Sequence, residues 1–177
     1  GNPNIVNIGG GQGQSSGDDL LDMANDLMIN YNKKFAKAAP VLFRDDQIYQ
    51  ASSILMGKNK PNPLLLGSAG VGKTAIAEEL ARRIEIKHDS IHPNLHDHTI
   101  WELPIANLVA GAGRRGALET AVQQLIEFAS KPKYKAIIFI DEIHQLTSDR
   151  TQTYEKIAQM LKPALARGEM RLIGSTT

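Results

Sequence analysis

"PLLLGSAGVGKT", residues 63–74, combines a short apolar run, a glycine-rich loop and the start of a helical pattern. Its last eight residues match the spacing G-x-x-x-x-G-K-[ST], in which glycines let the backbone curl so that its N–H groups face phosphate oxygens. A helix that begins at Lys73 would add the positive end of its dipole at the same place. The stretch therefore predicts a phosphate-binding loop between a strand and a helix.

The residues of this loop have distinct expected roles. We expect Lys73 to reach the β- and γ-phosphates of ATP and to take part in catalysis, and the Thr74 hydroxyl to bind Mg²⁺. The remaining candidate nucleotide-binding residues of the loop are Gly67, Ser68, Ala69, Gly70, Val71 and Gly72.

Two adjacent carboxylates, Asp141 and Glu142, follow the unbroken apolar run "AIIFI" at 136–140. Acids at the end of a buried strand are costly unless they serve a cation or a water. We expect Asp141 to hold Mg²⁺ beside the loop and Glu142 to polarise an attacking water. A kinase would not need that glutamate, so the pair favours hydrolysis. His144 is interpreted as a polar residue at the start of a helix.

Short apolar runs alternate with helical patterns after residue 62. We predict strands at 63–67, 99–105, 135–141 and 171–177, and helices at 73–86, 116–130 and 151–161. This alternation is typical of an α/β fold, a three-layer sandwich around a mainly parallel sheet. Ligands of such sheets bind at the carboxyl ends of the strands, where both stretches above are expected to lie.

The composition limits the function classes. A chain of 177 residues that is 42% hydrophobic can bury one core, and its net charge of +1 does not favour bulk nucleic-acid binding. The lack of cysteine excludes a disulfide scaffold and a thiolate metal site. Neither a long apolar span nor a leader pattern is present, so we expect a soluble, cytoplasmic protein without a membrane partner.

Three segments are expected along the chain. Residues 1–17 are rich in Gly, Gln and Ser and predict a flexible linker. Residues 18–39 carry apolar side chains at helical spacing and predict one amphipathic helix. Residues 40–177 form the expected nucleotide-binding core, which starts with a helix at about 45–57. Hydrolysis leaves two classes of protein open, because "DEIH" (141–144) and "GSTT" (174–177) also fit nucleic-acid helicases.

Longer signals favour one class. The stretches "NPLLLGSAGVGKTAIAEELARRI" (62–84), "LVAGAGRRG" (108–116), "IIFIDEIH" (137–144) and "LKPALARGEMRLIGSTT" (161–177) occur in this order. Together they resemble the first AAA+ module of Clp-type ATPases of the ClpA and ClpB kind, from about Pro40 to the last residue. "LKPALARG" has no counterpart known to us in helicases, so a nucleic-acid-stimulated ATPase becomes the third choice.

The resemblance implies the ATP-binding, Mg²⁺-dependent ATPase core of a protein unfoldase or remodelling chaperone. Such proteins act on protein substrates as homo-hexameric rings, and some dock a peptidase. The resemblance also implies adenine contacts at Val41 and Leu42 and a sensor role for Thr177. Phe43 stands where the family normally has glycine, so we expect a reshaped or partly filled base pocket.

Two departures from the family affect these expectations. Arg114, followed by Arg115, stands where Clp modules carry the aromatic residue of the pore loop that grips the substrate. An assembly or scaffold module with incidental hydrolysis is therefore an alternative. The chain also ends at the sensor strand, before the last core strand, the arginine finger and the helical lid of the family. We expect this incomplete core to bind ATP weakly and to hydrolyse it slowly.

Overall fold

The computed structural model describes residues 17–57, 64–66, 72–111, 113–148 and 151–176, with only the backbone at 64–66 and at Lys73. The helices are α1 (Asp19–Leu27), α2 (Tyr31–Phe35), α3 (Asp45–Leu55), α4 (Lys73–Glu85), α5 (Ile105–Ala110), α6 (Ala117–Ser130), α7 (Gln145–Ser148) and α8 (Gln152–Ala166), with a 3₁₀ turn at Pro93–Leu95. The strands are β1 (Ile29–Asn30), β2 (Leu64–Leu66), β3 (Thr99–Glu102), β4 (Ala136–Ile140) and β5 (Arg171–Thr176). Within these residues, no helix combines the length and apolar character that a membrane crossing requires.

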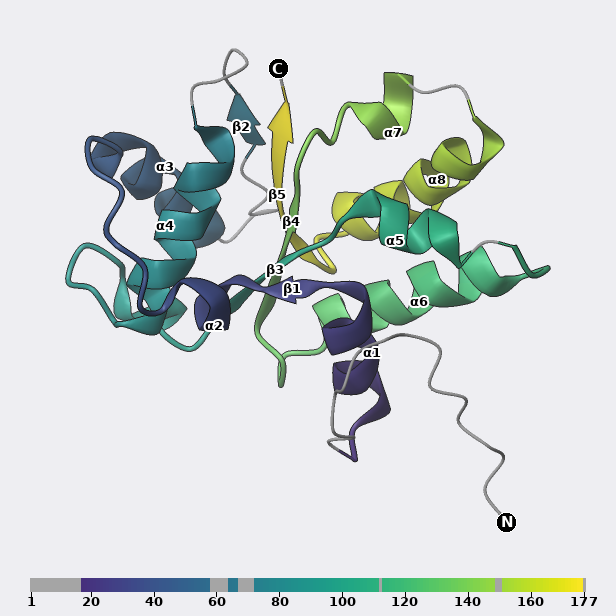
Figure 1. Ribbon diagram of the computed structural model, residues 1–177, viewed down its shortest axis with the longest axis horizontal. Coiled ribbons are helices and arrows are strands. Elements are labelled where there is room, and N and C mark those ends of the chain that lie inside the picture. The colour runs from purple at the N-terminus through teal and green to yellow at the C-terminus, as the bar shows by residue number, and fades with distance from the viewer. Residues whose placement is uncertain (1–16, 58–63, 67–71, 112, 149–150, 177) are drawn as a thin grey trace.

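The strands form one sheet in the order β1-β3-β4-β5-β2. Strands β3, β4, β5 and β2 pair in parallel, whereas the two residues of β1 add to the outer edge of β3 in the antiparallel direction. Parallel neighbours need crossover connections, which here are helices that pack on both faces of the sheet (Figure 1). The predicted α/β sandwich with a mainly parallel sheet is confirmed.

Strand β4 contributes to two hydrophobic cores, one on each face of the sheet, and all five of its residues are buried. Successive side chains of a strand point to opposite faces of the sheet. Ile138 and Ile140 pack with residues of α1, α5, α6 and α8. Ile137 and Phe139 pack with residues of α2, α3 and α4 on the other face. The apolar run therefore reflects burial on both faces, and it fixes the position of the carboxylates that follow.

The prediction of one helix over residues 18–39 is wrong. Helix α1 ends at Leu27, the chain pairs with β3 at Ile29–Asn30, and α2 then begins, with the Asn30 side chain accepting from the Lys33 N–H at 3.0 Å. The reason is that the apolar positions serve different faces of the sheet. Met28 packs in the core with α6, whereas Tyr31 packs in the core with α4, and one straight helix cannot reach both.

Asn32 of α2 is buried and completes the outer edge of β3. Its amide nitrogen donates to the His98 carbonyl at 2.8 Å, and its amide oxygen accepts from the Ile100 N–H at 2.9 Å. Tyr31 donates a short hydrogen bond to the Glu102 carboxylate on the same strand. A side-chain amide therefore takes the place of a neighbouring backbone along the part of β3 that β1 does not reach.

Prolines explain two differences in element bounds. The predicted strand 99–105 stops at Glu102, because Pro104 has no N–H for a ladder and the chain turns into α5 at Ile105. The predicted helix 151–161 continues to Ala166 through Pro163. Pro163 is exposed, so water can satisfy the carbonyl that loses its helical partner there.

Candidate functional site

The phosphate-binding motif enters helix α4 through a left-handed glycine. Gly72 has φ 76° and precedes the first helical residue, Lys73, as the motif predicts. The Arg44 guanidinium packs against this turn, since a β-carbon at position 72 would lie 3.3 Å from Arg44 Nη2. Loop residues 67–71 and the Lys73 side chain lie outside the described residues.

Ser175 of β5 anchors the carboxylate pair that follows β4. Its fully buried hydroxyl donates a short hydrogen bond to Asp141 Oδ1 and accepts from the Glu142 N–H at 3.0 Å. The Ser175 carbonyl accepts from the Ile143 N–H at 2.8 Å. The chain at 141–143 is thereby fastened to the end of the neighbouring strand, so both carboxylates lie at the carboxyl edge of the sheet.

Thr74 and Asp141 bring two oxygen ligands together. Thr74 Oγ1 lies 3.4 Å from Asp141 Oδ2, which is long for a hydrogen bond between a hydroxyl and a carboxylate. A hydroxyl oxygen and a carboxylate oxygen are donors that Mg²⁺ prefers. The two oxygens, and their position at the start of α4, therefore fit the predicted role of Thr74 and Asp141 as metal ligands.

Glu142 adopts an unusual backbone conformation and has an unexpected neighbour. Its φ is 53°, in the left-handed region that non-glycine residues avoid, and its N–H donates to Ser175 Oγ and Asp141 Oδ1. His144 Nε2 lies 3.3 Å from Glu142 Oε2, and His144 Nδ1 lies 2.9 Å from the Thr176 hydroxyl. His144 directly precedes α7 (Gln145–Ser148), as the helix-start interpretation predicts, and its ring also contacts the carboxylate that the sequence singled out.

Sequence reasoning missed Ser175, Thr176 and His144. All three lie in the quoted stretches "DEIH" and "GSTT", and polar side chains at the carboxyl ends of two neighbouring parallel strands are a usable signal. Only Thr177 of "GSTT" was assigned a role, and it lies outside the described residues.

The predicted adenine contacts lie on the segment before α3. Val41 is half-buried, whereas Leu42 is 69% exposed. Phe43 has φ 64° and is 90% exposed. Its ring therefore points to solvent, and the reshaped or partly filled base pocket stays a prediction. Its left-handed backbone is the conformation that glycine adopts without strain, which explains a glycine preference at this position.

A buried ion cluster ties this segment to helix α4. The Glu79 carboxylate accepts from Arg82, from Arg83 Nε at 3.2 Å and from the Val41 N–H at 3.4 Å. Arg83 continues to Asp45 at 2.6 Å, on the first turn of α3. Burial alone would raise the pKa of Glu79, but the hydrogen bonds from Arg82, Val41 and Arg83 outweigh it and hold the pKa below its usual range.

Arg114 and Arg115, the candidate pore-loop residues, lie between α5 and α6 and are exposed. Within the described part of the chain, no acidic side chain pairs with either guanidinium. The structure does not bring them to the carboxylates at the end of β4.

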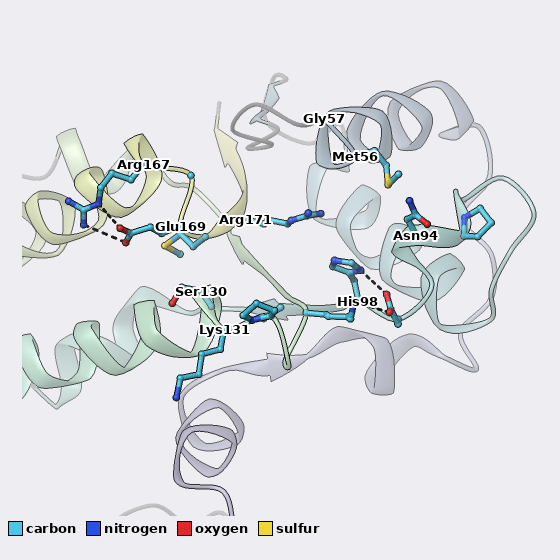
Figure 2. A pocket seen from close by; sticks show the side chains of 17 residues that line it. Met56, Gly57, Asn94, His98, Ser130, Lys131, Arg167, Glu169 and Arg171 are labelled. Atoms are coloured by element: carbon cyan, nitrogen blue, oxygen red, sulfur yellow. Dashed lines mark hydrogen bonds and ion pairs between the residues drawn. The ribbon is translucent and has the colours of Figure 1, made fainter.

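A hollow of about 1030 Å³ lies at the opposite edge of the sheet, by the amino ends of β4 and β5 (Figure 2). Its charged side chains are largely paired among themselves, as with Arg167 and Glu169 or Lys135 and Asp97. Burial, and then the charge of Arg171, lower the pKa of His98 at its rim. None of the predicted site residues lines this hollow.

Comparisons with known proteins identify a family for this chain. The family model for "ATPase family associated with various cellular activities (AAA)" matches residues 63–177. Chaperone protein ClpB of Enterococcus faecalis is 43% identical over 145 residues, which are 81% of this chain and 16% of that protein. ClpB of Aquifex aeolicus is 42% identical over 152 residues, 84% of this chain and 15% of that protein.

Solved structures show the same relationship. The Saccharomyces cerevisiae Hsp104:casein complex superposes with a TM-score of 0.75 at 34% identity, covering 88% of this chain and 26% of that one. The Hsp104–ADP complex gives 0.73 at 34% identity over 87% of this chain and 26% of that one. The chain therefore spans between a seventh and a quarter of these relatives' lengths. With the motif, the strand order and the carboxylate pair in place, the chain belongs to the AAA family of ATPases, as a Clp-type module.

Proposed function

We propose that this module hydrolyses ATP in a Mg²⁺-dependent reaction, with Glu142 as the residue that orients the attacking water. The observation that carries the proposal is the Ser175 anchor, which places Asp141 beside Thr74 and leaves Glu142 at the same edge of the sheet. The loop at 67–74, with Lys73, would bind the phosphates, and Thr74 and Asp141 would hold the metal. Bound there, Mg²⁺ would neutralise charge on the phosphate oxygens.

The proposed catalytic step needs a base that faces the γ-phosphate. Glu142 is only partly exposed, and its Oε1 atom has no hydrogen-bond partner among the described residues. A carboxylate oxygen in this state can accept the proton of a water and direct the water's lone pair to phosphorus. Val41 and Leu42 would contact the base, and Thr177 would help to hold the water.

For the whole protein we propose a cytoplasmic unfolding or remodelling chaperone that works as a hexameric ring on protein substrates. Support comes from the similarity to ClpB and to Hsp104, the latter in complex with casein. A docked peptidase is not part of this proposal. The exposed pair Arg114 and Arg115 favours one alternative, an assembly module in which ATP binding organises a ring and turnover is incidental.

Glu142→Gln tests the catalytic assignment. We expect hydrolysis to fall about 10²- to 10⁴-fold, which is the usual contribution of a general base, while ATP binding is retained. Lys73→Ala should instead lose ATP binding. Phosphate release and fluorescent-nucleotide titration measure the two properties, and Glu155→Gln on the exposed side of α8 is the matched control. Undiminished turnover in Glu142→Gln would disprove the assignment.

The same variants separate the two functions of the whole protein. A remodelling ATPase loses function in both Lys73→Ala and Glu142→Gln. An assembly module loses assembly only in Lys73→Ala and keeps its function in Glu142→Gln.

A further inference from the structure

His144 bridges two side chains that come from different elements. Its Nε2 atom faces Glu142 Oε2 at 3.3 Å, and its Nδ1 atom faces the Thr176 hydroxyl of β5 at 2.9 Å. The backbone on both sides of the bridge is fixed, by the Ser175 hydrogen bonds at residues 142 and 143 and by the pairing of Thr176 with Leu66 of β2. The imidazole therefore has defined partners on both of its nitrogens.

The chemistry of these partners selects one tautomer. An ionised carboxylate only accepts hydrogen bonds, so Nε2 must carry a proton in order to bond to Glu142. In a neutral imidazole Nδ1 is then an acceptor, and the Thr176 hydroxyl can donate to it. The chain of donors runs from Thr176 through His144 to Glu142.

The bridge leaves half of the Glu142 carboxylate unused. Oε2 lies 3.3 Å from His144 Nε2, whereas Oε1 has no partner among the described side chains or backbone groups. Attraction between the imidazole and Oε2 at this distance favours one rotamer of the carboxylate, so it also biases the orientation of the other oxygen. Orientation of a reacting group contributes to rate because misplacement by about 1 Å can cost about 10²-fold.

We propose that His144, kept in its Nε2–H tautomer by Thr176, is a positioning residue that orients Glu142 toward the attacking water. The proposal rests on the proposed function, in which Glu142 activates that water. It assigns to "DEIH" a third functional residue and to "GSTT" a role for Thr176 that acts through His144. Such a device affects the chemical step and not the binding of ATP.

Thr176→Val keeps the shape of the side chain and removes the hydroxyl. We expect kcat for ATP to fall about 10- to 100-fold, the usual effect of losing a group that fixes a functional imidazole, with KM unchanged. Thr176→Ser, which restores the hydroxyl, should recover most of the loss. Thr120→Val, on the exposed surface of α6, is the matched control. His144→Phe combined with Thr176→Val should be no slower than His144→Phe alone, because the two residues act as one unit.

A second measurement does not depend on turnover. Long-range ¹H–¹⁵N spectra of the His144 ring should show Nε2–H in the unaltered chain, and a mixture of tautomers in Thr176→Val. An Nδ1–H ring in the unaltered chain would overturn the proposal. So would normal kcat in Thr176→Val when Glu142→Gln is inactive, and that result would leave the proposed function intact. Normal turnover in Glu142→Gln would instead refute the proposed function itself.

Discussion

Glu79 on α4 and Glu142 after β4 are both carboxylates with side-chain partners, but they differ in how completely their oxygens are satisfied. Both Glu79 oxygens accept from Arg82, Arg83 or Val41, and the side chain is 0% exposed. Glu142 has one oxygen 3.3 Å from His144 Nε2 and a side chain that is 36% exposed. A fully satisfied cluster can only support structure, whereas a carboxylate with a free oxygen at the end of a strand can meet a ligand. The difference separates a stabilising acid from a reactive one.

Replacement of each acid by alanine tests this separation most strongly. Glu79→Ala leaves the largely buried Arg82 guanidinium without a carboxylate and Arg83 with Asp45 alone, so we expect a loss of about 3–5 kcal/mol in the free energy of unfolding. Glu142→Ala removes a partly exposed side chain and should change it by only about 0.5 kcal/mol. Urea unfolding followed by circular dichroism measures both. Equal losses in the two variants would contradict the comparison.

Backbone strain at Phe43 and Glu142 gives a second comparison, with a smaller expected effect on the free energy of unfolding. Phe43 and Glu142 both have left-handed φ values, of 64° and 53°, but the N–H of Glu142 is secured by Ser175 and Asp141. A β-carbon in this conformation costs about 1–2 kcal/mol, and glycine avoids this cost. Glycine also makes the unfolded chain more flexible, which offsets about 0.5–1 kcal/mol of the gain. We therefore expect Phe43→Gly to stabilise the protein by about 0.5–1 kcal/mol.

The control for this prediction is Phe43→Ala, which removes the exposed ring and keeps the β-carbon. It should leave the free energy of unfolding in urea close to that of the unaltered chain. If the alanine variant is stabilised as much as the glycine variant, the ring and not the backbone is responsible.

Asp18 is an acid of a third kind, with the smallest expected effect. It caps α1 and accepts from the Tyr134 hydroxyl, and this hydrogen bond is the largest cause that lowers its pKa from 3.8 to about 2. Because the folded pKa lies below the unfolded one, Asp18 stabilises the fold above about pH 4, and this contribution disappears as the pH falls toward 2. Asp18→Asn should flatten that part of the stability profile, measured by thermal unfolding from pH 2 to 5.

Asp26→Asn, an exposed change on the same helix, should keep the slope between pH 4 and pH 2. A slope that also persists in Asp18→Asn would assign the acid sensitivity to other carboxylates.

Much of this arrangement was predictable from local patterns. The alternation of apolar runs and helical periods predicts the parallel sheet, and the spacing of "GSAGVGKT" predicts Gly72 at the entry to α4. The position of Asp141 and Glu142 after a buried run predicts that they lie at the carboxyl edge. These patterns depend on neighbours in sequence, which is why one chain is sufficient to read them.

The remaining features depend on contacts between distant residues. Ser175 bonds to Asp141 across 34 positions, and nothing near either residue specifies the partner. The break after α1 arises because Met28 and Tyr31 pack on opposite faces of the sheet, whereas helical spacing records only that both are apolar. Likewise, the role of His144 depends on the register of β5 beside β4, which local propensity does not encode.

The Asn32 amide has a consequence for how copies of this chain meet. A sheet edge with unused N–H and C=O groups is a template on which another chain can add a strand, and such addition leads to aggregation. Along β3, the Asn32 amide hydrogen-bonds to the His98 carbonyl and the Ile100 N–H, and β1 pairs with Trp101 and Glu102. The outer edge of β3 therefore offers no continuous template for intermolecular strand addition, and a single buried side chain supplies much of this protection.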